Sequence, residues 1–453
     1  MASACGVDFG TSNSTVGWFE PGGLTLSAAN VSGPVTGLLA DRAVAGGGGS
    51  GLASSLLSLE EGKPTLPSVV FFNAEDDSVS YGRAALTTYL AGYEGRLMRS
   101  MKSLLGTSMM DGQTEVQGRA LPFRQLLAYF IGELKRRGEQ QAGQSFEHAV
   151  FGRPVHFVDD DLEADQLAQT TLGEIAQSVG FKDVSFQFEP IAAAFDYESR
   201  ISGEELVLIC DIGGGTSDFS LVRLSPQRAN LLDRRADILG NGGVHIGGTD
   251  FDKYLSLGHL MPLLGLGGRL GNQTEVPSRY YFNLATWHTI NLNYTQKIWR
   301  ELQDVYRDVS SADLRQRFER LLHLISERDG HWLALKAEEG KISLSDRDAI
   351  ELPLERLKNK GGSACSLHLD QGGFLQSVSH LIAQVEQAVA KVLSDAGLQA
   401  SQIDTVFFTG GSSGVCGLRQ RLGALLPDAK KVEGDLFGSI GTGLGLDAYR
   451  KYR

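Results

Sequence analysis

A ten-residue pattern near the start of the chain returns about 200 residues later, and this repeat constrains the fold more than any other feature. The first copy runs from Val7 to Val16 and the second from Cys210 to Phe219. Each copy has an aspartate between apolar residues, then glycine, small hydroxyl residues and a second strand-like run. This is typical of a β-hairpin with a glycine- and hydroxyl-bearing turn. A duplicated lobe, with one turn from each half facing a shared cleft, accounts for the repeat, the 453 residues and the 56 glycines together.

The rest of the chain reads as an α/β protein. Apolar residues at helical spacing predict amphipathic helices over 123–134 and 378–393, the second stopped by Gly397. Short β-branched or aromatic runs between the helical patterns predict strands at 68–72, 149–151, 206–210 and 405–408. These runs are strand-sized, far short of the roughly 20 apolar residues that span a bilayer.

Charge and cysteine usage exclude several classes of protein. The formal net charge of −12 and the absence of a long basic run argue against nucleic acid or an anionic membrane as partner. The four cysteines are far apart and lack metal-ligand spacing, so we interpret them as reduced thiols. The N-terminal residues have neither the basic nor the apolar stretch of a secretory signal. We therefore expect a soluble cytoplasmic protein.

The two turns suit a phosphate-bearing ligand. Backbone N–H groups in a turn with little side-chain bulk converge on an anion. Asp8 and Asp211, just before the turns, would face the same phosphates, which is repulsive unless a hard cation such as hydrated Mg²⁺ lies between them. One such turn is usually only a hairpin, but two matched copies favour a nucleotide site. Neither a P-loop nor a G-x-G-x-x-G motif after a strand is present. The hydroxyl groups available to phosphate oxygens are those of Thr11, Ser12, Thr216 and Ser217.

These motifs resemble the ATPase domain of DnaK-type heat-shock chaperones, within the actin, hexokinase and heat-shock ATPase superfamily. The order and spacing of the matches hold across nearly the whole chain. The resemblance implies an α/β actin-like ATPase fold, with two duplicated ribonuclease-H-like lobes around a central nucleotide cleft. The strongest matches are 7–16, 188–194, 211–219, the G-G-x-D-F-D segment 247–252, and 405–413; weaker ones are 65–68, 102–106 and 338–345.

The resemblance also implies a division of the chain. Lobe I would take residues 1–205, with an outer subdomain at about 31–139 and a returning C-terminal segment at about 430–453. Lobe II would take residues 206–429, with an enlarged outer subdomain at about 250–345. The 85 residues 253–337 exceed what the chaperones carry there. They are either a partner surface or extra core helices. Their notable apolar residues are Trp287, Trp299 and a helical set of Leu314, Phe318, Leu321, Leu322 and Ile325.

Individual roles follow from the same resemblance. Asp8 and Asp211 would position the hydrated Mg²⁺, and Lys102 would reach the γ-phosphate and the attacking water. The alternative for Lys102 is a solvated surface lysine. Glu189 has two possible roles. It is either a catalytic acid or a structural residue at the start of a helix, because Pro190 follows it and proline is favoured at the first helical position. The catalytic set is Lys102, Glu189, Asp211, Thr216 and Asp218. The residues around ATP or ADP would be Gly10, Thr11, Ser12, Asn13, Gly213, Gly214, Gly215, Thr216, Gly247, Gly248, Glu338, Lys341, Ser345, Gly410, Gly411, Ser412 and Asp435.

The sequence departs from the family at three places. Ile342 and Gly414 stand where the family brackets adenine with two arginines, so a stacking contribution is missing. After Pro154, the acidic run 159–161 replaces a stretch with an arginine that relays the ATP state, which implies altered coupling. We expect that no peptide-binding domain follows the closing helix, an arrangement that would resemble the truncated DnaK-like proteins called YegD.

The leading hypothesis is a monomeric, Mg-ATP-binding, DnaK-like chaperone ATPase. Slow ATP hydrolysis would be coupled to lobe closure and to a protein partner or client. Two alternatives remain open. One is a small-molecule kinase of the same superfamily, and the other is a nucleotide-binding scaffold or filament protein with negligible turnover.

Overall fold

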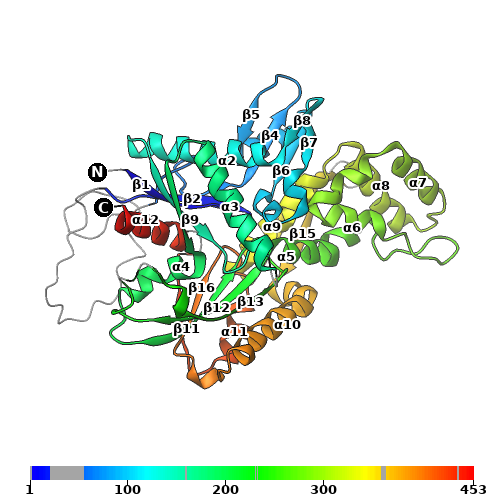
Figure 1. Ribbon diagram of the computed structural model, residues 1–453. Helices are drawn as coiled ribbons and strands as arrows, with labels where there is room; N and C mark the ends of the chain where they lie inside the picture. The colour runs from blue at the N-terminus through cyan, green and yellow to red at the C-terminus, as the bar shows by residue number, and fades with distance from the viewer. Residues whose placement is uncertain are drawn as a thin grey trace.

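The computed structural model describes residues 3–20, 56–158, 161–229, 231, 233–358, 364–435 and 438–452. The glycine-rich stretch 46–51 and residues 159 and 160 of the acidic run lie outside the described residues. Two five-stranded sheets form the centres of two lobes, and the outer parts of the lobes lie at the upper right of the view in Figure 1.

The two sheets have the same topology, as the internal repeat predicts. In each sheet the first strand of the repeated hairpin is central. It pairs antiparallel with the second strand and parallel with the fourth. The first sheet has the order β10-β9-β1-β2-β3 and the second β13-β12-β11-β16-β17. The strands are β1 (Ala4–Asp8), β2 (Asn13–Gly17), β3 (Leu66–Pro67), β9 (His148–Arg153), β10 (Asp183–Phe188), β11 (Glu205–Ile212), β12 (Ser217–Leu224), β13 (Ile238–Val244), β16 (Thr405–Thr409) and β17 (Lys430–Glu433).

Helices cover both faces of the first sheet. The apolar stripe that begins at Phe123 lies on α2 (Phe123–Ala142), which packs with α3 (Leu162–Ser178) over one face. On the other face, α4 (Glu189–Glu198) and α12 (Ser439–Lys451) lie between the two sheets (Figure 1). In lobe II, α10 (Gln371–Asp395) carries the second predicted stripe into the core beside α11 (Leu418–Leu425).

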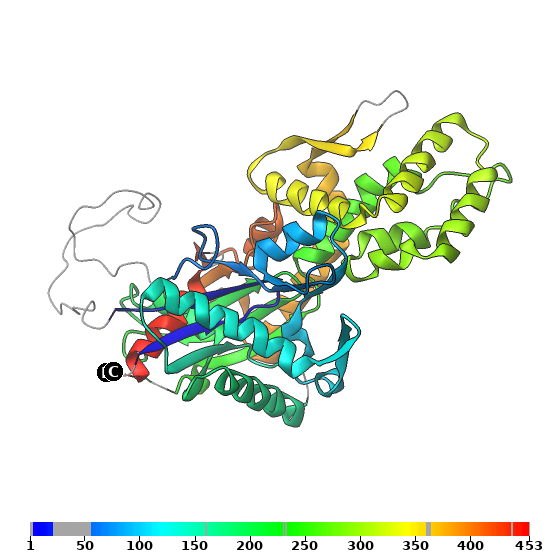
Figure 2. The ribbon, with the colours of Figure 1, turned by 90° about the horizontal axis from the view of Figure 1, so that it is seen from above.

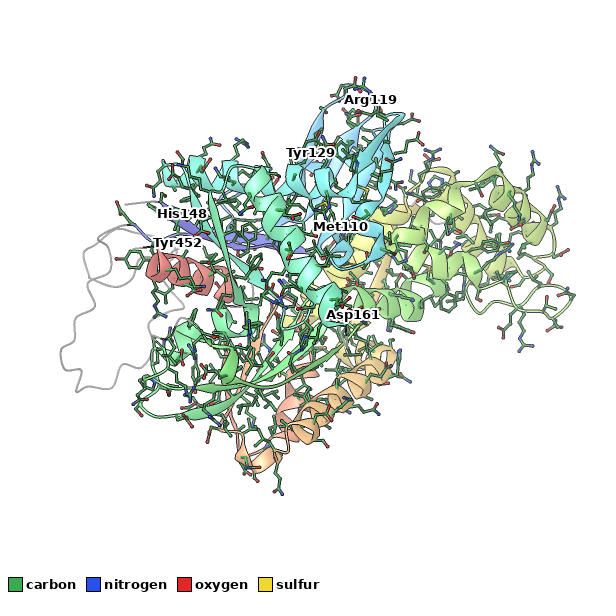
Figure 3. The ribbon with its side chains drawn as sticks, in the orientation of Figure 1. Met110, Arg119, Tyr129, His148, Asp161 and Tyr452 are labelled. Carbon is green, nitrogen blue, oxygen red and sulfur yellow. The ribbon has the colours of Figure 1, made fainter. Side chains whose placement is uncertain are left out.

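Glycines allow α12 to approach the first sheet closely. A Cβ on Gly443 would lie 1.9 Å from the carbonyl oxygen of Ala192 in α4, and a Cβ on Gly6 would lie 2.2 Å from the backbone nitrogen of Gly445. Beyond α12, the rings of His148 and Tyr452 stack with centroids 4.7 Å apart (Figure 3). The C-terminal helix is therefore part of the lobe I core and lies directly against β1.

The outer part of lobe I is a small sheet with a helix. A three-stranded sheet of order β5-β4-β6 packs under α1, and the hairpin β7–β8 precedes α2. The segment that contains Lys102 forms the short helix η1, followed by η2. The bounds are β4 (Val69–Asn73), β5 (Val79–Tyr81), α1 (Gly82–Leu90), β6 (Gly95–Arg99), η1 (Met101–Leu104), η2 (Ser108–Asp111), β7 (Gln113–Val116) and β8 (Arg119–Pro122).

The outer part of lobe II is larger, and its helices α6 to α8 extend away from the two sheets as an arm (Figure 2). The apolar side chains expected on a helix around Leu314 lie on α8 and enter the lobe II core. The hairpin β14–β15 packs beside α9. The bounds are η3 (Arg235–Asp237), α5 (Gly248–Leu255), η4 (Ser256–Leu260), η5 (Met261–Leu264), α6 (Arg279–Ala285), η6 (Trp287–Tyr294), α7 (Gln296–Arg307), α8 (Ala312–Ser326), α9 (Gly330–Asp346), β14 (Ala349–Lys358), β15 (Ala364–Asp370) and η7 (Ala400–Gln402).

All four cysteines are buried and free, as expected for reduced thiols. Burial raises the pKa of Cys416 to about 11, so this thiol, near the end of the 405–413 segment, stays protonated at neutral pH. No helix in the described ranges is long and apolar enough to cross a membrane.

Candidate functional site

The two repeated turns meet in the folded chain. A Cβ built on Gly214 in the second turn would lie 1.8 Å from the Oγ of Ser12 in the first turn. The two turns are therefore in contact, and a side chain at position 214 would require Ser12 to shift. The fold thus brings together segments about 200 residues apart in the chain.

Ser68 holds the first turn in place by hydrogen bonds. It follows Pro67 in segment 65–68, one of the weaker matches to the family motifs. The Oγ of Ser68 donates to the carbonyl oxygen of Gly10 at 2.7 Å, and its backbone N–H donates to the carbonyl oxygen of Ser12 at 2.9 Å. Gly10 also permits a tight turn, since a Cβ there would lie 2.1 Å from the carbonyl oxygen of Asn13. Ser68 received no role from the sequence, yet it fixes the backbone of the predicted phosphate loop.

The second turn is braced by the start of α5. The backbone N–H of Gly248 donates to Gly213 at 3.0 Å, and both the N–H and the Oγ1 of Thr249 donate to Gly214, at 2.8 and 2.9 Å. A Cβ on Gly247 would lie 2.5 Å from the backbone nitrogen of Gly215. The residues 213–216, 247 and 248 predicted from the sequence thus form one hydrogen-bonded layer, made of the second turn and the start of α5. The sequence assigned no role to Thr249, which holds this layer together.

Lys102 is not a solvated surface lysine. Its Nζ lies 2.5 Å from the Oε1 of Glu189, and the two side chains are only 11% and 12% exposed. Burial works against the ammonium charge, but Glu189, Asp8 and Asp211 outweigh it and raise the pKa of Lys102. Because these three acids belong to different elements, the fold alone creates this charge cluster.

Asp8 and Asp211 occupy equivalent places in the two sheets, at the ends of β1 and near the end of β11. Burial raises the pKa of both carboxyl groups. The carboxylate of Glu189 adds to this effect at Asp8, and that of Asp218 adds to it at Asp211. Burial is the largest cause of both shifts, but repulsion between the carboxylates contributes as well, and Lys102 opposes it at both sites. The cluster therefore favours a further cation.

A hydrated Mg²⁺ fits this donor set. Carboxylate oxygens are the ligands it prefers, and it usually keeps several waters. Within the described ranges, no group of three or more His, Cys, Asp or Glu side chains is placed to ligate a metal directly.

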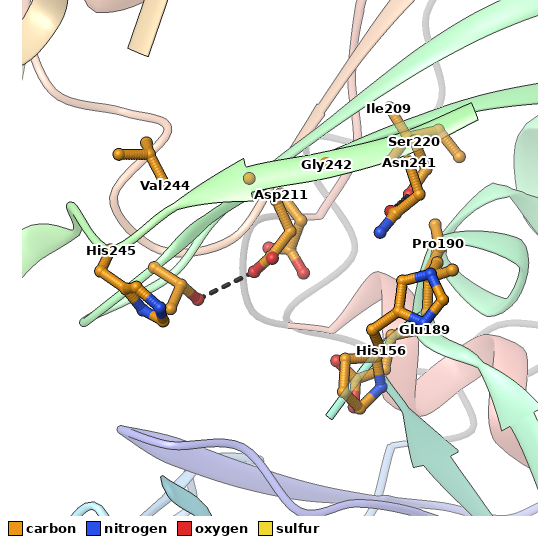
Figure 4. A pocket seen from close by; sticks show the side chains of 15 residues that line it. His156, Glu189, Pro190, Ile209, Asp211, Ser220, Asn241, Gly242, Val244 and His245 are labelled. Atoms are coloured by element: carbon orange, nitrogen blue, oxygen red, sulfur yellow. Dashed lines mark hydrogen bonds between the residues drawn. The ribbon is translucent and has the colours of Figure 1, made fainter. Parts of the chain in front are cut away.

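Asp218 and Thr216 line a pocket beside these acids. The Oγ1 of Thr216 donates to the Oδ2 of Asp218 at 2.8 Å. The pocket is also lined by Glu189, Pro190 and Asp211, and Figure 4 shows Glu189 and Pro190 across it from Asp211. Glu189 is the first residue of α4, as the following proline predicts, and its side chain nevertheless reaches the pocket. The structural and chemical interpretations of Glu189 are therefore compatible.

The predicted adenosine-side helix is α9. Glu338, Lys341 and Ser345 are spaced three and four residues apart and so share one face. The Nζ of Lys341 lies 2.8 Å from the Oδ1 of Asp252 and donates to the carbonyl oxygen of Gly248 at 3.0 Å. Burial raises the pKa of Asp252 to about 6, although Lys341 opposes the shift. Asp252 is a member of this site that the sequence assigned no role.

The turn after β16 closes the same side of the cleft. Gly410 has a φ of +79°, and a Cβ there would lie 2.4 Å from the Oδ1 of Asp211. The backbone N–H of Ser412 donates to the carbonyl oxygen of Ile212 at 2.9 Å, while Gly411 is exposed. This turn therefore packs directly on the predicted metal-binding strand. Asp435, which follows β17, is exposed.

Ile342 lies one residue beyond Lys341 on α9 and is 57% exposed. An exposed apolar side chain can contact a base, but it provides none of the cation–π attraction of an arginine. Gly414 provides no side chain at all.

The last residue of β9 is an arginine to which the sequence assigned no role. Arg153 donates to the carbonyl oxygen of Pro154 at 2.9 Å, and its Nη2 lies 2.8 Å from the Oδ2 of Asp165 in α3. Asp161 begins α3 by accepting a hydrogen bond from the backbone of Ala164 at 2.9 Å. The described part of the acidic run is thus a helix cap, and Arg153 joins Pro154 to α3.

Comparison with known proteins is consistent with this geometry. The family model described as "Hsp70 protein" matches residues 50–262 and 318–435, more than half of the chain. It skips 263–317, which includes most of the arm. The chaperone protein DnaK of Thermosipho africanus is 25% identical over 413 residues, covering 90% of this chain and 52% of its own length. That of Thermosipho melanesiensis is 24% identical, with 90% and 53% covered. The chain spans about half the length of the curated relatives it matches.

Proposed function

Because this chain belongs to the Hsp70 protein family, with its actin-like ATPase fold, we propose that its cleft binds Mg-ATP and hydrolyses it slowly. The observation that carries the proposal is the convergence of two equivalent strand ends. Asp8 and Asp211 meet there beside the buried pair of Lys102 and Glu189. A buried acidic cluster with one lysine, under two glycine turns, suits a magnesium-bound polyphosphate better than a bare anion or a neutral ligand.

Binding would use the backbone of the two turns. N–H groups of segments 10–13 and 213–216 would donate to phosphate oxygens, with help from the hydroxyl groups of Thr11, Ser12 and Thr216. Asp8 and Asp211 would hold the hydrated Mg²⁺, which supplies positive charge to the phosphates. Ser68 and Thr249 already fix both turns through backbone hydrogen bonds, so little ordering is required when the nucleotide enters.

Hydrolysis would follow from the groups that surround the terminal phosphate. The Nζ of Lys102 would stabilise negative charge on the transferred phosphoryl group. Glu189 holds that lysine at 2.5 Å, and Asp218 with Thr216 would orient the attacking water through their hydroxyl and carboxylate groups. Lys102 is tied to Glu189, and water would be oriented by a single hydroxyl–carboxylate pair. We therefore expect turnover to be slow.

On the adenosine side, Glu338, Lys341 and Ser345 of α9 would face Gly410, Gly411 and Ser412 of the turn after β16, near Asp435. The exposed Ile342 and the absent side chain at Gly414 would weaken the hold on the base. We therefore expect lower affinity for ATP than two stacking arginines would give.

The nucleotide-dependent closure of the lobes would be recognised by a partner protein. The matched relatives carry the name chaperone protein DnaK, and closure of two lobes on a nucleotide is a state that a client or partner can read. We propose a monomer acting in the cytoplasm. Arg153 would connect the nucleotide to the outside of lobe I, because it contacts both Pro154, which lines the pocket, and Asp165 of the outer helix α3.

The test is calorimetric titration of nucleotide-stripped protein with Mg-ATP, with phosphate release followed on the same samples. We expect binding and slow release in the wild type, and loss of both in Asp211→Asn. Asp428→Asn removes the same charge from an exposed turn and serves as the control. Absence of binding in the wild type, or equal binding in Asp211→Asn, would refute the proposal. Binding without any release of phosphate would refute the hydrolysis alone.

A further inference from the structure

An arginine of lobe I and a glutamate of lobe II have charged groups that no side chain neutralises. Arg99 is the last residue of β6, and Glu338 lies in α9. Both residues are half-buried. Within the part of the chain that the structure describes, neither the guanidinium of Arg99 nor the carboxylate of Glu338 has a hydrogen bond or an ion pair. The N–H donors of the one and the oxygen acceptors of the other are therefore available to a ligand.

An aromatic side chain fixes the direction of Arg99. Its guanidinium lies over Trp287 in η6, 4.2 Å from the ring centroid. The ring of Trp287 in turn meets that of His331 edge to face, with centroids 4.7 Å apart. His331 is on α9, about two helical turns before Glu338, so these two residues share a face of the helix. Arg99 is therefore held towards the face of α9 that includes the adenosine-side residues.

The electrostatics agree with this placement. Burial lowers the pKa of Arg99, and the carboxylates of Glu338 and Asp252 oppose the shift. Asp252 is already paired with Lys341 at 2.8 Å. Of these two acids, Glu338 is thus the one whose charge has no partner, although it is close enough to act on Arg99. A gap that accepts a small polar group separates the guanidinium from this carboxylate.

The position of the gap along α9 indicates which part of a nucleotide it would receive. Lys341 donates to the carbonyl oxygen of Gly248, which belongs to the layer made of the second turn and the start of α5. Glu338 lies about one helical turn before Lys341, whereas the exposed Ile342 and Ser345 lie beyond it. The gap is therefore next to the proposed phosphate layer. The sugar is the part of a nucleotide that is joined directly to the phosphates.

We propose that Arg99 binds the ribose of the nucleotide by donating hydrogen bonds to its vicinal hydroxyl groups, opposite the carboxylate of Glu338. This inference rests on the proposed nucleotide-binding function. A hydroxyl group donates and accepts at once, so a vicinal diol satisfies a guanidinium on one side and a carboxylate on the other. A ligand without these hydroxyls leaves both charges without partners, which is costly. Arg99 therefore selects ribonucleotides over nucleotides that lack the diol.

The test is calorimetric titration of nucleotide-stripped protein with Mg-ATP and with Mg-2′,3′-dideoxy-ATP. We expect the wild type to bind Mg-ATP at least about ten-fold more tightly, as hydrogen bonds to charged groups predict. Arg99→Met keeps an apolar contact with Trp287 and removes the donors. It should bind Mg-ATP about ten-fold more weakly than the wild type and bind the dideoxy nucleotide equally well, because only Mg-ATP loses a contact.

Arg96→Met is the matched control. It removes the same charge from the same strand, where Arg96 donates to the Oγ1 of Thr114 at 3.1 Å. It should leave the affinity for both nucleotides unchanged. If Arg99→Met does not fold, Arg99→Lys, which keeps the charge without the planar fork, takes its place with the same expectation.

The two nucleotides separate a ribose contact from a general effect on the lobes. An equal loss of affinity for both in the Arg99 variant would show that Arg99 only supports packing, and would overturn the inference. Unchanged affinity for Mg-ATP in that variant, or equal affinity of the wild type for the two nucleotides, would overturn it as well, while the proposed function would stand. If the wild type binds neither nucleotide, the proposed function fails and this inference fails with it.

Discussion

Replacement of Lys102 by alanine tests the central claim about the cleft. Lys102 is the cation that the structure places among Asp8, Glu189 and Asp211, with its Nζ 2.5 Å from Glu189 and nine-tenths of both side chains buried. Breaking a buried ion pair costs about 3–5 kcal/mol, because one charge is left without its partner. We expect about 3 kcal/mol, the lower end, since removal of the lysine raises the pKa of the neighbouring acids further and lets one of them take up a proton.

The effect on catalysis should be larger than the effect on binding. Loss of a charge that stabilises the transferred phosphoryl group lowers turnover by about 10²–10³-fold. The turns that we propose to bind the phosphates do not include Lys102, so Mg-ATP should still bind. The assays are urea unfolding for stability, calorimetry for binding and phosphate release for turnover.

A matched lysine separates the claim from a generic loss of charge. Lys182 pairs with Glu147 at the same 2.5 Å distance, but the side chains are 67% and 45% exposed. Lys182→Ala should leave stability, binding and turnover essentially unchanged, since exposed pairs contribute little. If Lys102→Ala behaved like Lys182→Ala in turnover, Lys102 would have no catalytic role. If only its stability matched the control, the buried cluster would not be as charged as we infer.

Two further predictions concern pH and packing. Burial lowers the pKa of His331 to about 4, and Arg99 acts in the same direction. As the pH falls from about 6.5 towards 4, the unfolded chain binds a proton there that the folded chain does not, so stability should fall by up to about 1.4 kcal/mol per pH unit. His331→Phe should lose this part of the slope in urea titrations between pH 7 and 4.5; an unaltered slope would contradict the argument. Gly214→Ala should weaken Mg-ATP binding measured by calorimetry, because its Cβ would lie 1.8 Å from the Oγ and 2.9 Å from the Cβ of Ser12, so that the first turn must shift. Ser12→Gly in the same chain should restore part of the binding, and a failure to restore any would show that the contact between the turns is not the cause.

Local patterns in the sequence determined the elements and the duplication. The amphipathic stripes of α2 and α10, the strand runs and the repeated hairpins are set by residues close together in the chain. The α/β class and the actin-like fold followed from these patterns and from the resemblance they carry. Backbone propensity and apolar periodicity act over a few residues, which is why they can be read without a structure.

The tertiary structure decided which distant side chains meet. The sequence could not choose between a surface lysine and a buried one at Lys102, because only the fold brings Glu189 to it across 87 positions. It left Ser68, Thr249 and Asp252 without roles, because each acts through a backbone or charge partner in another element. The contact between Tyr89 and His331, 242 positions apart, gave no local signal at all. Burial, pairing and pKa depend on such long-range contacts, and these exist only once the two lobes have packed.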